Sequence, residues 1–593
     1  ENTINVSLAE ENKSLEEVVV VGYGTQKKSV VTGAISSIKA KDIENIPNGR
    51  IEQTLQGRTS GVIIAANAGQ PGSPATVRVR GITTFDTYGG NNPLWVVDGV
   101  IVDNGAIGFV NQADIESMEV LKDAASLAIY GARAASGVIL VTTKKGKQGK
   151  MTLNYNGFYG VSSPAKMLNL LNATEYGAIM NEKAVAAGQN LVFPDLSTLG
   201  VGTDWQKQIF NNNAQRNSHE VSVGGGGEIS TFFLSFGSSD QEGIVATEIS
   251  NFNKKNFRIN STHKFKEWVT IGQTLGYTHQ KGIGLGHTNS EYVGPLSSAI
   301  NLDPTTPVVV TDPAIANAAP YNNNPVIRDA NGNPYGISSL VGQEMTNPLA
   351  YIQTRLGQYG WSDDFVGNIY FDFKLHKDFK FRTTLGGKLA YWGAEGFTPE
   401  YYLNASTLTS QNNISRRNNK SFGWNIENTL TYTKQIEKHS ITVLLGQGAY
   451  QDNKIFTETG VTYFDIPVTN YQDASFNFDV PASQRSSYSV DGVEHNVNSL
   501  FARVNYDYNE KYLFNGVIRR DGSSRFGQNN QYGVFPSFSV GWVASNEDFW
   551  KENKVVTNLK IRAGYGVTGN DAIPDFGYLS TIGGGRNYTI GDA

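Results

Sequence analysis

The chain has 593 residues, no cysteine and a formal net charge of −5, and its mean hydropathy is −0.32. Without cysteine, this sequence has no disulfide, thiol nucleophile or cysteine-bound metal, and its slightly acidic balance offers no basic surface for nucleic acid. No run approaches the ~18 consecutive apolar residues of a membrane helix. That test does not detect transmembrane β-strands, in which apolar and polar residues alternate.

The first 148 residues divide into three parts. Residues 1–14 contain one strand-like piece, "TINVSL", which we interpret as the end of a preceding domain. Residues 15–34 are a Val-rich stretch with a polar linker, and residues 35–148 predict a compact α+β unit. The elements expected in that unit are a short helix in "NGRIEQTLQGRTSGV", a strand in "ATVRVRGI", a hairpin in "PLWVVDGVIVD", a strand and helix in "DIESMEVLKDAASLAIYG" and a closing strand in "SGVILVTTKKG".

The stretch "LEEVVVVGYGTQKKSVVTGA", residues 15–34, begins like a dinucleotide-binding strand with a glycine turn. The third glycine of that fingerprint would fall at Lys27, however, and no helical pattern follows. An ordinary buried strand is one alternative. We favour an exposed, unpaired strand to whose edge a partner strand adds, with Glu16 and Glu17 as charged residues that guard it against aggregation.

After residue 150 the pattern changes to long alternating strands that continue to the end of the chain. In "STFFLSFGS", Phe232, Leu234 and Phe236 share one face and Ser235 lies opposite, which is the period of a β-strand. About 13 such strands are expected. Short links alternate with long ones at 161–217, 240–252, 282–363, 392–419 and 453–496. This asymmetry favours a transmembrane barrel over a soluble sandwich or solenoid, with long stretches such as 282–363 outside the cell.

Several motifs resemble one known family. "LEEVVVVGYGTQKKSVVTGAI" is similar to the TonB-box region of the SusC-like (SusC/RagA) TonB-dependent outer-membrane transporters of Bacteroidota. "QTLQGRTSGV", "VRVRGI", "PLWVVDGV" and "IESMEVLKDAASLAIYGARAASGVILVTTKKG" resemble the plug domain of that family, and "RRDGSSRFG", "YGVFPSFSVGW" and "LKIRAGYGVTGN" resemble its barrel landmarks. The resemblance covers essentially the whole chain. Its plug motifs are shared by all TonB-dependent receptors, whereas the Val-rich box and "DGSSRFG" are more specific to the SusC-like branch.

The resemblance implies a transmembrane β-barrel, 22-stranded in the family, with an N-terminal α+β plug domain inside it. Residues 1–14 would be the remnant of a carboxypeptidase-regulatory-like domain, 15–34 the TonB box and linker, 35–148 the plug, and 149–593 a barrel that is incomplete at its C-terminus. Because about 13 strands are too few to close such a barrel, we expect the natural polypeptide to continue for roughly nine more strands.

The resemblance also implies which residues carry the function. Arg80, Glu119 and Arg133 would form a buried polar cluster that latches the plug against the barrel wall, and the alternative is a solvated strand face. We interpret Asp98 as a plain hairpin-turn residue. The implied TonB box is Glu17, Val18, Val19, Val20 and Val21.

The resulting hypothesis is TonB-dependent import of a large nutrient, an oligosaccharide or a peptide, across the outer membrane. The implied partners are TonB, a SusD-like surface lipoprotein that acts as a lid, and outer-membrane lipid, and no nucleic acid is expected. The alternative is a barrel that serves as a structural subunit of an outer-membrane assembly or secretion complex, with the other subunits as partners. A siderophore or cobalamin receptor is a third possibility, which the long loops and SusC-type motifs disfavour.

The sequence gives no sign of an enzyme. Its seven histidines are scattered, without an HExxH motif or a metal-ligand spacing. His219, His287 and His495 stand alone in the sequence, and lone histidines are more often structural than ligands. We therefore expect no catalytic residue, no cofactor and no metal site, and no substrate-binding residue stands out.

Overall fold

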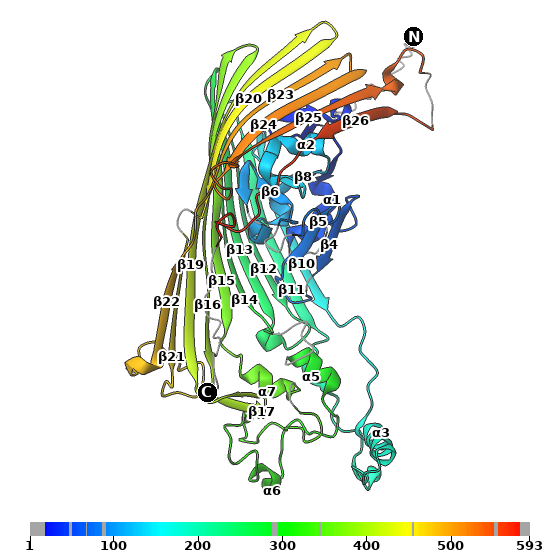
Figure 1. Cartoon of the computed structure of the whole chain (residues 1–593), viewed down its shortest axis with the longest axis vertical. Coiled ribbons are helices and arrows are strands. Elements are labelled where there is room, and N and C mark those ends of the chain that lie inside the picture. The colour runs from blue at the N-terminus through cyan, green and yellow to red at the C-terminus, as the bar shows by residue number, and fades with distance from the viewer. Residues whose placement is uncertain are drawn as a thin grey trace, which may run out of the picture.

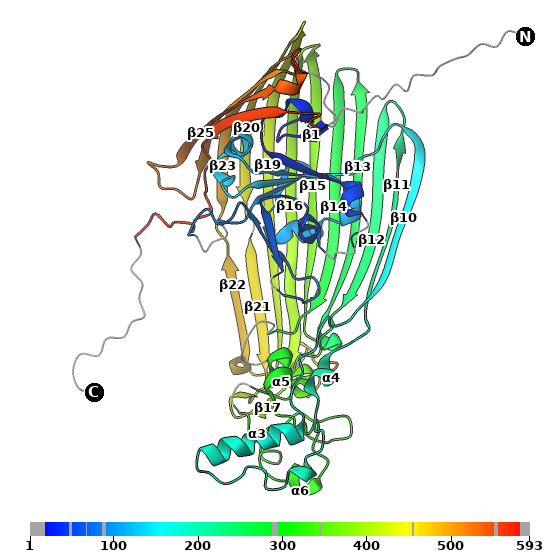
Figure 2. The same ribbon diagram turned by 90° about the vertical axis from the view of Figure 1, so that its right-hand side faces the viewer.

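The computed structural model describes residues 18–580 except 45, 47–49, 67, 86–89, 103, 287–293, 343–344, 454–455 and 551–554. A large curved antiparallel sheet, here called the wall, runs the length of the molecule (Figure 1). A compact α+β unit, here called the plug and extending from β3 to β9, lies against its concave side (Figure 2). This is the fold class that the sequence predicted. Of the helices in the described part of the chain, none has the length and apolarity that a membrane crossing needs.

Fifteen strands form the wall in the described residues, and thirteen of them follow one another as antiparallel neighbours. Thirteen agrees with the number that the alternating pattern predicts, but the other two strands, β21 (Thr457–Phe464) and β22 (Arg485–Asp491), correct that prediction, because both lie within 453–496, which the pattern assigned to a long link. The far end of β19 extends past β20 and pairs with β21, which in turn pairs with β22. The strands are β10 (Gly149–Ser162), β11 (Ala214–Gly226), β12 (Ser230–Glu242), β13 (Asn251–Lys266), β14 (Val269–Ile283), β15 (Tyr359–His376), β16 (Phe379–Thr398), β19 (Asn413–Ile436), β20 (His439–Asp452), β21 (Thr457–Phe464), β22 (Arg485–Asp491), β23 (His495–Tyr508), β24 (Tyr512–Ser523), β25 (Tyr532–Val543) and β26 (Lys560–Gly566).

The alternation of side chains explains the two faces of the wall. On β13, Phe257 is exposed on the outer face, while its neighbours Asn256 and Arg258 are buried on the plug side. The same parity holds on β23, where Leu500 is exposed and Arg503 is buried. The outer face is therefore apolar and the inner face polar, which is the division that a lipid-facing barrel strand requires.

The plug is built on a five-stranded sheet in the order β3-β8-β9-β6-β7, and β4 and β5 form a separate hairpin. Its β6 and β9 are parallel, and its other neighbouring strands are antiparallel. β3 lies at one edge of this sheet, next to the residues that enter the plug from the N-terminal side. The elements are β3 (Ile35–Lys39), α1 (Ala40–Ile43), η2 (Ile51–Leu55), β4 (Val62–Ala66), β5 (Ala75–Val79), β6 (Leu94–Val97), β7 (Val100–Val102), η3 (Asn104–Phe109), η4 (Gln112–Asp114), β8 (Ile115–Leu121), α2 (Ala124–Leu127), η5 (Ala128–Arg133) and β9 (Val138–Thr143).

The long connections of the wall gather at the end away from β1 and form a folded cap (Figure 2). Trp205, Ala299 and Tyr351 lie in the apolar core of this cap. At the opposite end the strands are joined by tight turns, as between β23 and β24. The asymmetry of link lengths therefore corresponds to two different ends of the wall. The cap and its surroundings contain α3 (Ala173–Ala186), η6 (Leu196–Thr198), α4 (Trp205–Ile209), η7 (Thr247–Ile249), α5 (Pro295–Asn301), α6 (Pro313–Ala316), α7 (Pro348–Gln353), β17 (Tyr401–Asn404), β18 (Thr407–Thr409) and η8 (Ala482–Gln484), and η9 (Ala544–Asn546) lies at the other end.

The apolar outer face generates a prediction about lipid contact. Phe257→Arg should destabilise the folded wall by about 2–4 kcal/mol, because it places a cation on the outer face near the middle of β13. The matched control is Phe265→Arg on the same strand and face but close to the strand end, where the cost should be ~1 kcal/mol or less. Unfolding midpoints in urea, measured in lipid bilayers, compare the two. Equal destabilisation would show that this face does not contact lipid.

Candidate functional site at the plug and wall interface

The Val-rich strand is folded back on the chain that follows it. β1 (Val18–Val20) pairs antiparallel with β2 (Thr25–Lys27). Gly22 and Gly24, with φ of +73° and +90°, make the tight turn between the two strands. A 3-10 helix, η1 (Lys28–Val30), follows β2.

This pairing corrects the sequence interpretation. Val19 is only 2% exposed, so the prediction of an unpaired, exposed strand is wrong for Val18–Val20. The physical reason is that the glycine turn, which we had compared with a phosphate-binding loop, closes a hairpin. Glu17, the first residue of the predicted TonB box, lies outside the described residues.

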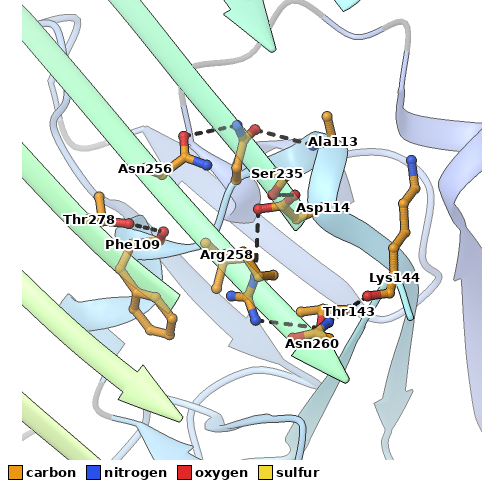
Figure 3. A network of polar contacts seen from close by, with 12 residues as sticks. Phe109, Ala113, Asp114, Thr143, Lys144, Ser235, Asn256, Arg258, Asn260 and Thr278 are labelled. Carbon is orange, nitrogen blue, oxygen red and sulfur yellow. Dashed lines mark hydrogen bonds and ion pairs between the residues drawn. The ribbon is translucent and has the colours of Figure 1, made fainter. Parts of the chain in front are cut away.

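A network of buried polar contacts joins the plug to β12, β13 and β14 (Figure 3). Its centre is Arg258 of β13, whose guanidinium lies 3.5 Å from Asp98 and 3.5 Å from Asp114. All three side chains are buried. Ser235 of β12 donates a hydrogen bond to Asp114 as well. One wall cation thus lies between two plug carboxylates, an arrangement in which each charge depends on the others.

Neutral polar side chains extend this network. Asn260 donates to the hydroxyl of Thr143 at 3.1 Å, and Thr278 donates to the carbonyl of Phe109 at 2.7 Å. Asn256 accepts a hydrogen bond from Asn111 at 3.0 Å. Beside these contacts, a cavity of about 220 Å³ lies between the plug and the first wall strands. The interface is therefore polar and borders on space that water can enter.

Asp98 has a larger role than the sequence suggested. It occupies the turn between β6 and β7 with a φ of +49°, as a turn residue does. Its carboxylate also accepts hydrogen bonds from the backbone N–H of Thr143 at 3.0 Å and from the Thr143 hydroxyl at 2.6 Å. With Arg258 as a third partner, Asp98 links the plug sheet to the wall, so the interpretation as a plain turn residue is incomplete.

A second group of contacts holds η5 of the plug against β24. Arg519 donates to the carbonyl of Ile129 at 2.6 Å and pairs with Asp521 at 2.7 Å. Asp521 accepts in turn from the backbone N–H of Ala132 at 2.7 Å. A Cβ at Gly131 would lie 1.8 Å from the Asp521 carboxylate, so this approach requires glycine.

The three residues of the predicted latch do not form one cluster. Glu119 lies buried on β8, where the Ser37 hydroxyl donates to it at 3.4 Å. Arg133 at the end of η5 lies over the ring of Tyr450, 4.2 Å from its centroid, and so contacts the wall. Arg80 is exposed. Among the described residues, no ion pair joins any two of Arg80, Glu119 and Arg133.

The sequence analysis missed the residues that make the plug and wall interface. Arg519 and Asp521 lie in "RRDGSSRFG", which the sequence analysis treats only as a barrel landmark, and Arg258 lies in a strand that it does not single out. A usable signal was present, because a charged residue at an inward-facing position in the middle of a barrel strand needs a buried partner. The sequence does not identify that partner, because Arg258 and Asp98 are 160 positions apart in the chain.

The histidines do not form a metal site in the described ranges, where no group of three or more His, Asp or Glu side chains is placed to hold an ion. His495 is buried and pairs with Asp571 at 2.9 Å. His219 contacts the hydroxyl of Tyr155 at 2.8 Å. His287 lies outside the described residues.

The Arg258 network generates a second prediction. Arg258→Met should loosen the plug, because it leaves Asp98 and Asp114 buried without their cation, a loss of about 3–5 kcal/mol for a buried pair. The measure is ion conductance through the full-length protein in planar bilayers, which should rise. The control is Arg382→Met, which removes a partly exposed arginine that pairs with Asp372 of the wall. Equal conductance of both variants and the parent would contradict the role of Arg258.

A third prediction concerns pH. Burial raises the pKa of Glu119 from 4.5 to about 7. The folded plug therefore favours the protonated form, and its free energy of unfolding should fall as the pH rises from about 4.5 to 7, by on the order of 3 kcal/mol. Glu119→Gln should abolish this dependence in urea unfolding at pH 5 and pH 8. Glu116→Gln, an exposed residue of the same strand, should retain it. A Glu119→Gln variant that keeps the full pH dependence would assign it to another group.

Comparison with known proteins agrees with this architecture. Residues 27–138 match the family model of the TonB-dependent receptor plug domain. The chain is 33% identical over 581 residues to TonB-dependent receptor P26 of Formosa agariphila, covering 97% of this chain and 55% of that protein. It is 32% identical to TonB-dependent receptor SusC of Bacteroides thetaiotaomicron, covering 97% of this chain and 56% of SusC. The chain thus spans a little over half the length of these relatives.

The fold has a close counterpart among solved structures. The RagAB peptide importer in its open-open state superposes with a TM-score of 0.80 at 22% identity, covering 97% of this chain and 63% of that one. A plug seated against an antiparallel wall, in a chain similar to SusC along almost all of its length, is what the motifs predicted. The chain belongs to the family of SusC-like TonB-dependent receptors, which are outer-membrane β-barrel proteins.

Proposed function

We propose that the protein imports a large nutrient, an oligosaccharide or a peptide, across the outer membrane with energy delivered by TonB. The observation that carries this proposal is the position of the Val-rich strand. β1 precedes the plug on the same chain and ends 14 residues before β3 begins. A pull on β1 therefore reaches the plug through a short segment, and the plug contacts the wall through groups that water can replace.

The Val-rich strand has an edge for TonB. In the described residues β1 pairs only with β2, so its second edge has no partner strand, and addition of a strand there requires that the buried Val19 is first released. TonB would add a strand to β1, with Glu17 to Val21 as the box. Main-chain hydrogen bonds formed along that edge transmit force in the direction of the chain.

The plug is arranged to yield to such a pull. In the part of the chain that the structure describes, β3 lies at the edge of the plug sheet and pairs with β8 alone, from Ile35 opposite Leu121 to Lys39 opposite Ser117. Ile35 is the end nearest β1, so a pull loads that end of the β3–β8 ladder. Loss of β3 leaves the contacts of the rest of the plug with the wall in place, among them the polar contacts of Arg258 and Arg519 and the apolar contacts of η5.

The cap supports the proposal of an extracellular partner. Its folded core presents a stable outer surface, and the segment around α3 leaves several apolar side chains exposed at the tip, among them Leu170, Ile179 and Val185. Exposed apolar groups of this kind mark interaction sites. We propose a SusD-like lipoprotein as the partner that covers this end. One structural relative is described as a peptide importer, which supports the peptide class.

Uptake by cells tests the proposed coupling. Deletion of Glu17 to Val21 should abolish uptake of the substrate, because no strand remains for TonB to bind, while folding and substrate capture at the surface stay intact. Deletion of Asn2 to Val6 removes the same number of residues upstream and should leave uptake unchanged. Growth on candidate oligosaccharides and peptides, with surface binding measured in parallel, gives the readout. Uptake at the parental rate without the box would instead favour a structural subunit of an outer-membrane complex.

A further inference from the structure

The segment directly after the Val-rich strand is held by the wall through both its backbone and its side chain. Arg503 of β23 donates to the carbonyl of Val21 at 2.7 Å and also to the carbonyl of Tyr23. The hydroxyl of Tyr23 donates to the carboxylate of Glu427 on β19 at 2.7 Å. Its ring stacks on Phe501, with 4.6 Å between centroids. Three wall residues thus fix the Gly22-Tyr23-Gly24 turn.

These contacts are buried and directional. Arg503 and Phe501 are buried on the inner face of β23. Arg503 reaches two backbone carbonyls of the turn, and such a fork of N–H donors fixes orientation as well as distance. The position of β1 follows from that of the turn, because Val20 is joined to Val21 and the hairpin is short.

The same wall residues also contact the plug. The ring of Tyr23 stacks with Phe501 and with Tyr130 of η5, whose centroid is 6.1 Å away. Arg519, which donates to the carbonyl of Ile129, lies over the ring of Phe501, 5.0 Å from its centroid. The turn after β1 and the η5 segment of the plug are therefore seated on one set of side chains.

We propose that Tyr23, Glu427 and Arg503 are positioning residues that clamp the chain between the TonB box and the plug, and that the clamp holds β1 on β2 only while η5 is seated. A plug movement that displaces η5 takes the Tyr130 ring away from Tyr23 and the Ile129 carbonyl away from Arg519, which lies over Phe501. The clamp then loses contacts, and the Val-rich strand becomes available. By reciprocity, release of Tyr23 weakens the seating of η5.

This proposal rests on the proposed function, since a clamp near the box matters only if the box is used. It adds that the resting protein keeps β1 from its partner. The side chains of Tyr23, Glu427 and Arg503 determine how firmly β1 is held. It also assigns the Gly-Tyr-Gly stretch a mechanical role distinct from the strand that TonB would bind.

Cysteine labelling tests the clamp without any transport. Residues 1–593 contain no cysteine, and any cysteine elsewhere in the full-length protein is replaced by serine, so a Val19→Cys variant reports on one buried position and its parent without this substitution is the blank. Its reaction with a polar maleimide is measured in outer membranes that contain the full-length protein and no TonB. Adding Tyr23→Phe should speed labelling roughly tenfold, as expected for loss of a hydrogen bond to a charged group. Glu427→Gln should also speed it.

The control is Tyr488→Phe, which removes another tyrosine-to-glutamate hydrogen bond, from Tyr488 to Glu458 at 2.8 Å. It lies on β22 near the cap and should leave the labelling rate unchanged. Heat-modifiable gel mobility checks that each variant is folded. Unchanged labelling in folded Tyr23→Phe and Glu427→Gln proteins overturns the clamp.

Two further outcomes separate the parts of the proposal. Arg133→Met should speed labelling of Val19→Cys through η5, and an unchanged rate overturns the link between η5 and the clamp. If labelling depends on Tyr23 but deletion of the box leaves uptake intact, the clamp stands and the proposed function fails. If deletion of the box stops uptake but Tyr23→Phe leaves the labelling rate of Val19→Cys unchanged, the proposed function stands and the clamp fails.

Discussion

The structure depends on a buried polar interface that must hold the plug and still let it go. Arg258 between Asp98 and Asp114 represents this constraint most clearly. A buried ion pair adds little net stability over well-packed apolar residues, yet loss of one partner is costly. Such an interface therefore fixes where the plug sits more than how tightly it is bound. Water can replace each contact once the plug moves, which would not be so for an interface made only of apolar side chains.

Apolar contacts are not absent from this interface, and their distribution is informative. They concentrate where η5 and the neighbouring plug residues meet β20, β23 and β24, in a cluster that includes Tyr130, Leu444 and Phe501. The charged network of Arg258 lies elsewhere, on β13. Near the Val-rich strand the plug is thus held by packing together with the buried pair of Arg519 and Asp521, whereas at β13 buried polar groups dominate. A local disturbance near β1 therefore acts on packing and on charge together.

The wall could be predicted from the sequence because each of its strands has one face toward an apolar environment and the other toward the polar side that contains the plug. That requirement appears as alternation in the sequence, for example Phe257 beside Arg258, and it also fixes which residues face the plug. The site could be predicted only in part. Arg133 does face the wall, but its contact is Tyr450 rather than Glu119, because pairing across the interface depends on how two separately folded units dock. The β1–β2 hairpin was missed for a local reason: a glycine turn between two β-rich segments is a hairpin signal, whereas the sequence analysis treats Val18–Val20 as an unpaired strand that waits for a partner.

The edge position of β3 has a consequence for how the plug resists force. Its five pairs with β8 begin at Ile35, the end that continues toward β1. Thermal fluctuations must break all five pairs together, so at rest the stabilising free energies of the pairs add. A directed pull from that end unzips them in succession and meets the resistance of one pair at a time. The plug can thus resist random motion and still yield to a pull along one direction. The stability of the seated plug and the force that unfolds β3 are therefore set independently.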